Sequence, residues 1–298
     1  MAFDFYFAGA TTNRIREWLV LLNANVLKSY YTDQATIKKF FEYKKNGWKG
    51  KLMIDNGEFT FHRHGGSIDI DEYIAWLNTY DEYIDYAIAV DNIPGKWRQP
   101  RTLKDYQVST QKTWENYLYM IERVKSPHKL LPVFHQGDDF SALERFLALK
   151  DLKYLCIAGS KDLTNADREV FYEKCFARID RVRPDIKVHC LGSATISNVE
   201  KFRFTSLDST TCNMVAAMGN IFIDGQVIYV GDKLATLKLK GADYLDALER
   251  HCVEYGININ DIGSDYQTRC MFNIKYMLTQ SAVVETYNTR VRRQQLFI

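Results

Sequence analysis

Three aspartates follow short apolar runs of the sequence, and their type and spacing point most directly to chemistry. Asp55 ends the run KLMID, Asp91 ends YAIAVD, and Asp208 lies within FTSLDST. A single aspartate after a strand most often caps the following helix. Three carboxylates that converge are costly unless they bind a cation or shift their protonation states. The spacing therefore predicts either a metal site or a set of acid/base and nucleophilic carboxylates.

The neighbouring apolar runs also end in polar residues or glycines. Gln136 follows KLLPVFH, Gly159 follows YLCIA, and Gly192 follows KVHCL. His135 and His189 lie inside these runs, where a histidine is more often a hydrogen-bonded core residue than a functional one. All of these positions belong to one functional site only if the fold gathers the ends of the runs.

The order of the apolar runs predicts a fold that does so. Short strand-like runs alternate with amphipathic helical stretches, which indicates a parallel sheet. Eight such steps without a domain-breaking linker predict a (β/α)8 TIM-type barrel, whose active site forms at the carboxyl ends of the strands. An open doubly wound sheet is the alternative, although FAGATTN after the first run contains a single glycine and is no dinucleotide fingerprint. The expected strands lie within 4–9, 25–31, 51–57, 86–91, 129–135, 154–159, 187–192 and 204–210, and the expected helices span 13–22, 34–45, 69–79, 103–124, 140–149, 165–182 and 196–201.

The chain beyond the eighth run predicts an extension of the barrel. IFIDGQVIYV reads as a hairpin about Asp224-Gly225, since Asp-Gly between alternating apolar residues is a two-residue turn signal. Helical patterns follow at residues 244–254 and 265–278. We therefore expect one barrel domain over residues 1–298, with 221–298 as a hairpin and helical extension.

Composition excludes several classes of protein. With 46% hydrophobic and 26% charged residues the chain is globular, and no apolar run approaches the ~20 residues that span a bilayer. We expect a soluble cytoplasmic protein, in the host cytoplasm if viral, with 6 reduced cysteines. The net charge of +2 gives no strong overall attraction to a polyanion, but basic segments at 38–51 and 96–104 carry interleaved aromatic residues, a weak nucleic-acid signal.

An ordered set of short segments resembles the tRNA-guanine transglycosylase (queuine tRNA-ribosyltransferase) family. The resemblance covers the chain from the third to the eighth run, and each segment alone is short and degenerate. It rests on IDNGEF (54–59), AVD (89–91), VFHQGD (133–138), YLCIAGS (154–160), VHCLG (188–192) and SLDSTTC (206–212).

The resemblance implies a barrel enzyme that exchanges guanine in a polynucleotide for a 7-deazaguanine base through a covalent aspartyl intermediate. A second carboxylate with a raised pKa would move the proton in both half-reactions. The target base must leave its stack to be reached, and Phe59, Phe61 or Trp97 would stack on it unless they are ordinary packing residues. The implied roles are Asp208 as nucleophile, Asp55 as general acid/base, and Asp91, Gln136, Gly159 and Gly192 as substrate-binding residues.

The chain departs from the family pattern in ways that bear on the metal and the polymer. The family's zinc site is three close cysteines and a distant histidine, whereas Cys252, Cys270 and His251 are too spread for four tetrahedral ligands. We therefore expect no zinc and no other cofactor. A compact chain of this kind resembles the phage and bacterial branch that inserts a base such as preQ0 into DNA, so DNA is favoured over tRNA as partner.

Two other classes remain open from the sequence. One is a metal-dependent barrel hydrolase in which Asp55, Asp91 and Asp208 hold a divalent ion. The other is a barrel that binds nucleic acid without catalysis. No membrane partner is expected, and the oligomeric state is unknown.

Overall fold

The computed structural model describes residues 3–9, 11–96, 99–160, 162–192, 201–231 and 242–295, with side chains to residue 282. The chain divides into two compact units, Met1–Tyr6 with Asn25–Asp208, and Phe7–Ala24 with Ser209–Ile298. The expected helix at 196–201 falls almost entirely outside the described residues.

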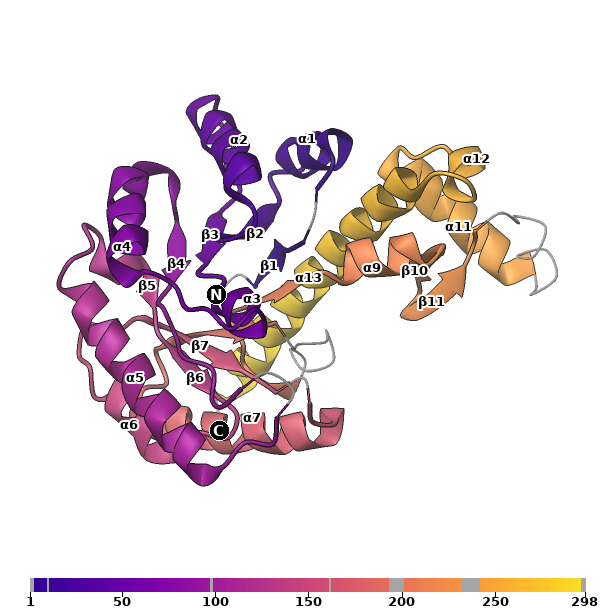
Figure 1. Cartoon of the computed structure of the whole chain (residues 1–298). Coiled ribbons are helices and arrows are strands. Elements are labelled where there is room, and N and C mark those ends of the chain that lie inside the picture. Colours follow the sequence, from indigo (N-terminus) through magenta and orange to yellow (C-terminus); the bar gives the residue numbers. More distant parts are fainter. Residues whose placement is uncertain are drawn as a thin grey trace. The chain divides into compact units, whose positions relative to one another are not determined.

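The first unit is built on a parallel sheet in the order β5-β4-β3-β2-β1-β9-β8-β7-β6. The two end strands are adjacent in sequence and separated by Pro132 alone, which has no N–H to continue the ladder. β5 pairs with β4 through Leu131 and Ile88, while β6 pairs with β7 through Val133 and Cys156. The sheet is therefore nearly closed and barrel-like (Figure 1). Its strands are β1 (Asp4–Phe7), β2 (Asn25–Ser29), β3 (Leu52–Asp55), β4 (Tyr86–Ile88), β5 (Leu130–Leu131), β6 (Val133–His135), β7 (Tyr154–Ala158), β8 (Lys187–Leu191) and β9 (Ser206–Ser209).

Amphipathic helices connect the successive strands of this unit and lie outside the sheet (Figure 1). The longer ones bury apolar side chains, such as Ile37, Phe40 and Phe41 on the first of them, whereas the short helix directly after β3 buries only Glu58. Capping boxes begin two of the longer helices, at Thr102 and Thr164. The helices are α2 (Gln34–Lys45), α3 (Glu58–Arg63), α4 (Ile70–Thr79), α5 (Leu103–Ile121), α6 (Phe140–Leu147) and α7 (Asn165–Val182), with 3₁₀ turns at Asp81–Tyr83 and Pro127–Lys129.

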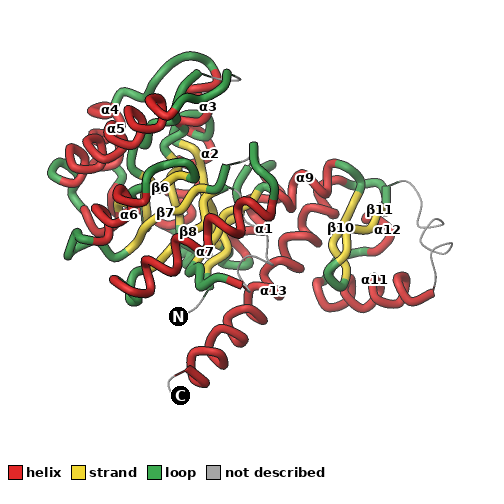
Figure 2. Tube along the Cα trace, turned by 90° about the horizontal axis from the view of Figure 1, so that it is seen from below, coloured by secondary structure: helices red, strands yellow, loops and turns green. Residues whose placement is uncertain are grey.

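The second unit packs around one long helix. The guanidinium of Arg269 donates to the carbonyls of Ala216, Ile262 and Gly263, which joins three of its segments. Trp18 donates to the carbonyl of Met271, so the N-terminal helix belongs to this unit. Figure 2 shows the hairpin beside the following helices. The elements are α1 (Asn13–Leu21), α9 (Thr211–Ala217), β10 (Asn220–Ile223), β11 (Gln226–Tyr229), α11 (Ala242–Tyr255), α12 (Ile259–Ile262) and α13 (Tyr266–Gln295).

The structure confirms the α/β class and the order of the expected strands. Each of the eight apolar runs forms parallel strand, and the hairpin turns at Asp224 and Gly225, both with positive φ. The expected helices at 34–45 and 165–182 have the bounds of α2 and α7. α3 and α9 were not expected, because each is a short helix directly after a strand end. Within the described residues, none of the helices combines the length and the apolar character that crossing a membrane demands.

Candidate active site

The three predicted aspartates all lie at the carboxyl ends of strands in the first unit. Asp55 ends β3, Asp91 follows β4, and Asp208 lies in β9. They are close enough to affect one another electrostatically. Burial raises the pKa of Asp55 to about 7, and the charges of Asp91 and Asp208 add to the rise. The prediction that these carboxylates converge is therefore confirmed in position.

A tight turn places Asp55. Gly57 adopts a φ of +91°, and a Cβ there would lie 2.7 Å from Cβ of Tyr31 and 2.9 Å from Oγ of Ser29. Glycine is therefore required at this position. The backbone of Gly57 forms a hydrogen bond to the carboxyl of Asp55 that lowers its pKa slightly, without offsetting the rise. Asp55 is thus held as a carboxyl group that is about half protonated near neutral pH.

Asp91 is buried and held on both oxygens. The amide of Asn56 donates to Oδ1 over 2.9 Å and to the carbonyl of Ala89 over 2.7 Å. Nε2 of His135 lies 2.7 Å from Oδ2. Burial alone would raise the pKa of Asp91, but the hydrogen bond and charge of His135, together with the Asn56 amide, bring it below its usual value. Asp91 is therefore an ionised, immobilised carboxylate.

His135 is an ion-pair partner and not an ordinary core histidine. Burial lowers its pKa, but hydrogen bonds to Asp138 and Asp91, and their charges, raise it to about 10. Asp138 is itself buried and accepts a hydrogen bond from Thr110 over 2.7 Å. His135 is thus a protonated imidazolium between two carboxylates, a hydrogen-bonded histidine whose partners lie 44 and 3 residues away along the chain.

Asp208 is held from the neighbouring strand. The backbone N–H of Gly192 donates to Oδ1 over 2.7 Å. Nε2 of His189, a fully buried side chain of β8, lies 3.3 Å from the same oxygen. Gly192 therefore contacts the predicted nucleophile directly, and His189 also belongs to the site.

Glu58 is an acidic residue of the site that sequence reasoning missed. It begins α3 and is only 4% exposed. Burial raises its pKa to about 7, with a further rise from the charge of Asp91. Its position directly after Asp55-Asn56-Gly57 was the available signal, but a glutamate in the first turn of a helix is usually a surface residue.

Gln136 and Gly159 lie on neighbouring strand ends, as predicted. The side-chain carbonyl of Gln136 accepts from the N–H of Ser160 over 3.0 Å, and its amide donates to the carbonyl of Asp167 over 3.1 Å. The side chain thus ties the end of β6 to the loop after β7, next to the half-buried Gly159. The contacts with a substrate expected for both residues remain predictions.

The two basic segments lie at opposite ends of the strands. Lys44 pairs with Asp85 over 2.7 Å and Lys51 with Asp4 over 2.6 Å, before the amino ends of their strands. The basic segment at 38–51 therefore lies away from the acidic cluster, because a loop that enters a strand lies away from the strand's carboxyl end. Lys96 and Arg101 come after the carboxyl end of β4 in the chain, and Arg101 lies 3.6 Å from Asp162.

The proposed stacking residues differ in their surroundings. Phe61 packs on Tyr31, with ring centroids 3.8 Å apart, whereas Phe59 is 47% exposed. Trp97 lies outside the described residues. Of these two described aromatic residues, Phe59 is therefore the one that remains exposed for stacking.

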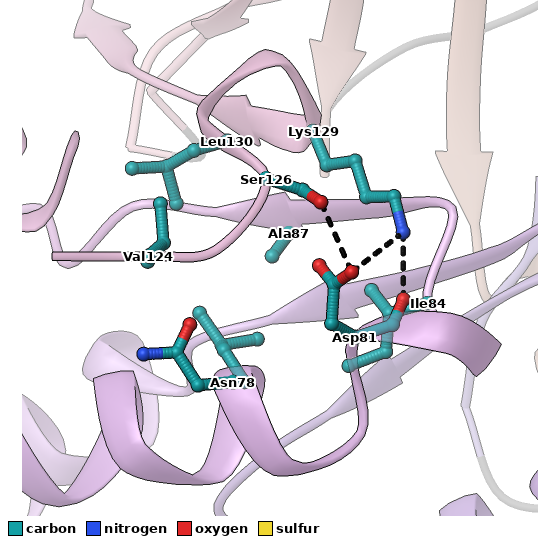
Figure 3. A pocket seen from close by; sticks show the side chains of 9 residues that line it. Asn78, Asp81, Ile84, Ala87, Val124, Ser126, Lys129 and Leu130 are labelled. Atoms are coloured by element: carbon teal, nitrogen blue, oxygen red, sulfur yellow. Dashed lines mark hydrogen bonds and ion pairs between the residues drawn. The ribbon is translucent and has the colours of Figure 1, made fainter.

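A small pocket opens at the opposite end of the barrel-like sheet. Figure 3 shows Asp81 facing Lys129 and Ser126, with Lys129 donating to the carbonyl of Asp81 over 2.6 Å. The cavity has a volume of about 20 Å³, room for roughly one water molecule. It is too small for a nucleobase.

The described residues contain no group of three or more His, Cys, Asp or Glu side chains arranged to hold a metal ion. The six cysteines, all within the described residues, are buried thiols that form no disulfide. No protein-family model and no curated protein sequence matches this chain significantly.

Proposed function

We propose that this chain is a (β/α)8 TIM-type barrel enzyme, a transglycosylase that exchanges guanine in a polynucleotide for a 7-deazaguanine base such as preQ0. One observation carries the proposal: three strand-end carboxylates lie close together in three different environments. Asp55 has a pKa of about 7, Asp91 is ionised and clamped, and Asp208 is held on one oxygen. Divergent environments of neighbouring carboxyl groups are typical of acid/base and nucleophilic assignments.

In the first half-reaction, Asp208 is the nucleophile. One of its oxygens attacks C1′ of the target nucleotide, and the bond from C1′ to the guanine nitrogen breaks. The electron pair of that bond leaves with the guanine, which takes the proton of protonated Asp55. The products are free guanine, an ionised Asp55 and a glycosyl ester of Asp208, as in retaining glycoside chemistry.

The second half-reaction returns both groups to their starting state. Asp55 accepts the ring N–H proton of the incoming 7-deazaguanine, whose nitrogen attacks C1′. The ester bond to Asp208 breaks, and its electron pair returns to the carboxylate. A carboxyl group with a pKa near the working pH suits both transfers, because it is available in both protonation states.

The clamped Asp91 suits recognition of the base. Oδ1 of Asp91 accepts one hydrogen bond from Asn56, and Oδ2 accepts one from His135. Each carboxylate oxygen has a second lone pair that can accept another. These remaining lone pairs would accept the N1–H and 2-amino protons of guanine, while Gln136 and the Gly159 backbone would meet the O6 side. The ionised state of Asp91 strengthens such bonds.

For the polymer, we propose DNA, with the same exchange on tRNA as the alternative. The preference rests on the resemblance to the phage and bacterial DNA-modifying branch, and the basic residues Lys96 and Arg101 would contact phosphates. Incubation with labelled guanine and either duplex DNA or unmodified tRNA tests the activity and separates the two polymers. Label in neither polymer would contradict the proposal.

Three matched variants test the roles of the acids. Asp208→Asn should abolish exchange, by about a thousandfold or more, and Asp55→Asn should slow it by about 10² to 10⁴. Asp151→Asn removes one charge from an exposed position before β7, at the opposite end of the strand, and should exchange like wild type. An Asp208→Asn variant that exchanges at the wild-type rate would refute the nucleophile assignment.

The metal-dependent hydrolase, in which Asp55, Asp91 and Asp208 would hold a divalent ion, is the alternative from the sequence, although the described side chains include no group of three arranged to hold a metal ion. It requires an added divalent ion for activity and predicts release of a hydrolysed product. Transglycosylation predicts full exchange in the presence of a chelator and no net loss of glycosidic bonds.

A further inference from the structure

The two oxygens of Asp208 have unlike surroundings. Oδ1 accepts the N–H of Gly192 over 2.7 Å and lies 3.3 Å from Nε2 of His189. Oδ2 has no hydrogen-bond partner among the residues that the structure describes. The carboxylate is thus anchored through one oxygen, and the other is left for a ligand.

His189 is itself held by a buried chain of hydroxyl groups. Its Nδ1 lies 2.5 Å from Oγ of Ser206, which in turn lies 2.5 Å from the hydroxyl of Tyr154. All three side chains are buried, and the ring of Tyr6 packs edge-on against the imidazole with centroids 5.8 Å apart. The imidazole therefore has one fixed orientation.

The hydroxyl chain determines where His189 carries its hydrogen. If Tyr154 donates to Ser206 and Ser206 donates to Nδ1, the neutral imidazole must carry its hydrogen on Nε2. The opposite direction would set a lone pair of Nε2 against the carboxylate oxygen, which is repulsive. Nε2 is fully buried and makes no in-line hydrogen bond in the resting structure. Its N–H thus has Oδ1 of Asp208 as the nearby acceptor, and such contacts tighten when a site is occupied.

We propose that His189 is a positioning residue for the nucleophile: it turns Nε2–H toward Oδ1 of Asp208, so that Oδ2 is the atom that bonds to C1′. This inference rests on the proposed transglycosylase function. It adds a histidine, fixed by Ser206 and Tyr154, to a reaction otherwise assigned to aspartates.

The arrangement affects the two half-reactions differently. When Oδ2 attacks C1′ and the base departs with its electron pair, Oδ1 becomes the carbonyl oxygen of the ester. Gly192 and His189 then donate to a neutral oxygen and bind it more weakly than the carboxylate. When the incoming base attacks C1′, the electron pair of the ester bond returns to Asp208 and the strong bonds are restored. The donors therefore favour departure of Asp208 over persistence of the ester.

Loss of the His189 donor should therefore make the covalent intermediate accumulate. His189→Leu removes the donor, whereas His189→Gln retains an N–H near the position of Nε2. A hydrogen bond to a charged group corresponds to about a tenfold to hundredfold change in the equilibrium between ester and free carboxylate. We expect His189→Leu to slow ester breakdown by about that factor, with a smaller effect on ester formation. The ratio of the rate of ester breakdown to the rate of ester formation should return toward the wild-type value in His189→Gln. In Ser206→Ala this ratio should fall, as in His189→Leu.

The experiment mixes full-length protein with guanine-containing DNA or tRNA and quenches it in denaturant, with intact mass spectrometry reporting the polynucleotide adduct. A preQ0 chase then gives the rate of ester breakdown. Tyr6→Phe is the matched control, because it removes a buried hydroxyl beside the imidazole but outside the hydroxyl chain, and its ratio of rates should equal that of wild type.

The outcomes separate the inference from the function beneath it. If wild type forms no adduct on Asp208 with either polymer, the proposed function fails and the inference with it. If wild type forms the adduct but His189→Leu or Ser206→Ala breaks it down at the wild-type rate, the inference alone is overturned. If His189→Leu does not fold, Ser206→Ala decides by the same comparison.

Discussion

Replacement of Asp55 by asparagine tests the electrostatics of the site without any assumption about substrate. The folded state raises the pKa of this carboxyl from 3.8 to about 7, mainly through burial and then through the charges of Asp91 and Asp208. The native state therefore binds this proton more tightly than the unfolded chain does. The stability from this group is fully present below pH 4 and is lost as the pH rises through 7. An asparagine is neutral throughout and has no such dependence.

The size of the effect follows from the shift. At about 1.4 kcal/mol per pH unit, a rise from 3.8 to about 7 corresponds to about 4 kcal/mol over the whole window. About 3 kcal/mol of it falls between pH 5 and pH 8. The free energy of unfolding of Asp55→Asn minus that of wild type should thus grow by about 3 kcal/mol in favour of the variant over this range. Glu58, whose pKa is also raised to about 7, is present in both proteins and cancels in the difference.

The assay is urea denaturation of both proteins at several pH values from 5 to 8.5, followed by fluorescence. Asp151→Asn is the control, because an exposed carboxyl should give a difference that does not vary with pH. A difference for Asp55→Asn that stays constant from pH 5 to 8 would refute the reasoning. It would mean that Asp55 is ionised in the folded protein and does not carry the proton.

Three further substitutions test other parts of the structure, each by urea denaturation. The pKa of His135 is raised to about 10, so its ion pair stabilises the fold below about pH 6.5, and this contribution is lost as the pH rises through 10. His135→Leu should lower the free energy of unfolding by about 3–5 kcal/mol at pH 6. The exposed control His128→Leu should lower it by about 0.5 kcal/mol or less. Gly137→Ala should lower the free energy of unfolding by about 2 kcal/mol or more, because φ is +110° and the new Cβ would lie 2.4 Å from the ring of Tyr106. An unchanged urea midpoint would contradict this geometry. Arg269→Met should destabilise the second unit by about 3 kcal/mol, since three backbone carbonyls lose their donor; a loss below about 1 kcal/mol would show that water replaces the guanidinium.

The positions of the three aspartates were predictable because they follow from the alternation of strand-like and helical stretches along the sequence. Parallel strands joined by helices place their carboxyl ends together, so Asp55, Asp91 and Asp208 had to share one end of the sheet once the runs were recognised as strands. The same rule places Lys44 and Lys51 at the opposite end of the sheet. Those residues precede a strand, and their charges are used by Asp85 and Asp4 at the other end.

The N-terminal helix shows a different limit of sequence reasoning. Its amphipathic pattern predicted helix at 13–22, and α1 spans Asn13–Leu21. Its grouping with α13 depends on contacts such as that between Trp18 and the carbonyl of Met271, which are 253 residues apart. Local periodicity carries no signal for a partner at that separation.

The sequence by itself determined the class of fold, the order of the strands and the end of the sheet at which three carboxylates meet, because these depend on periodicity and chain direction. Only the tertiary structure decided the state of each carboxylate. The imidazolium of His135 keeps Asp91 ionised, and burial among like charges brings the pKa of Asp55 to about 7. The N–H of Gly192 anchors one oxygen of Asp208, with Nε2 of His189 3.3 Å away. A pKa depends on desolvation and on charges a few ångströms away, and those neighbours come from strands far apart in the sequence.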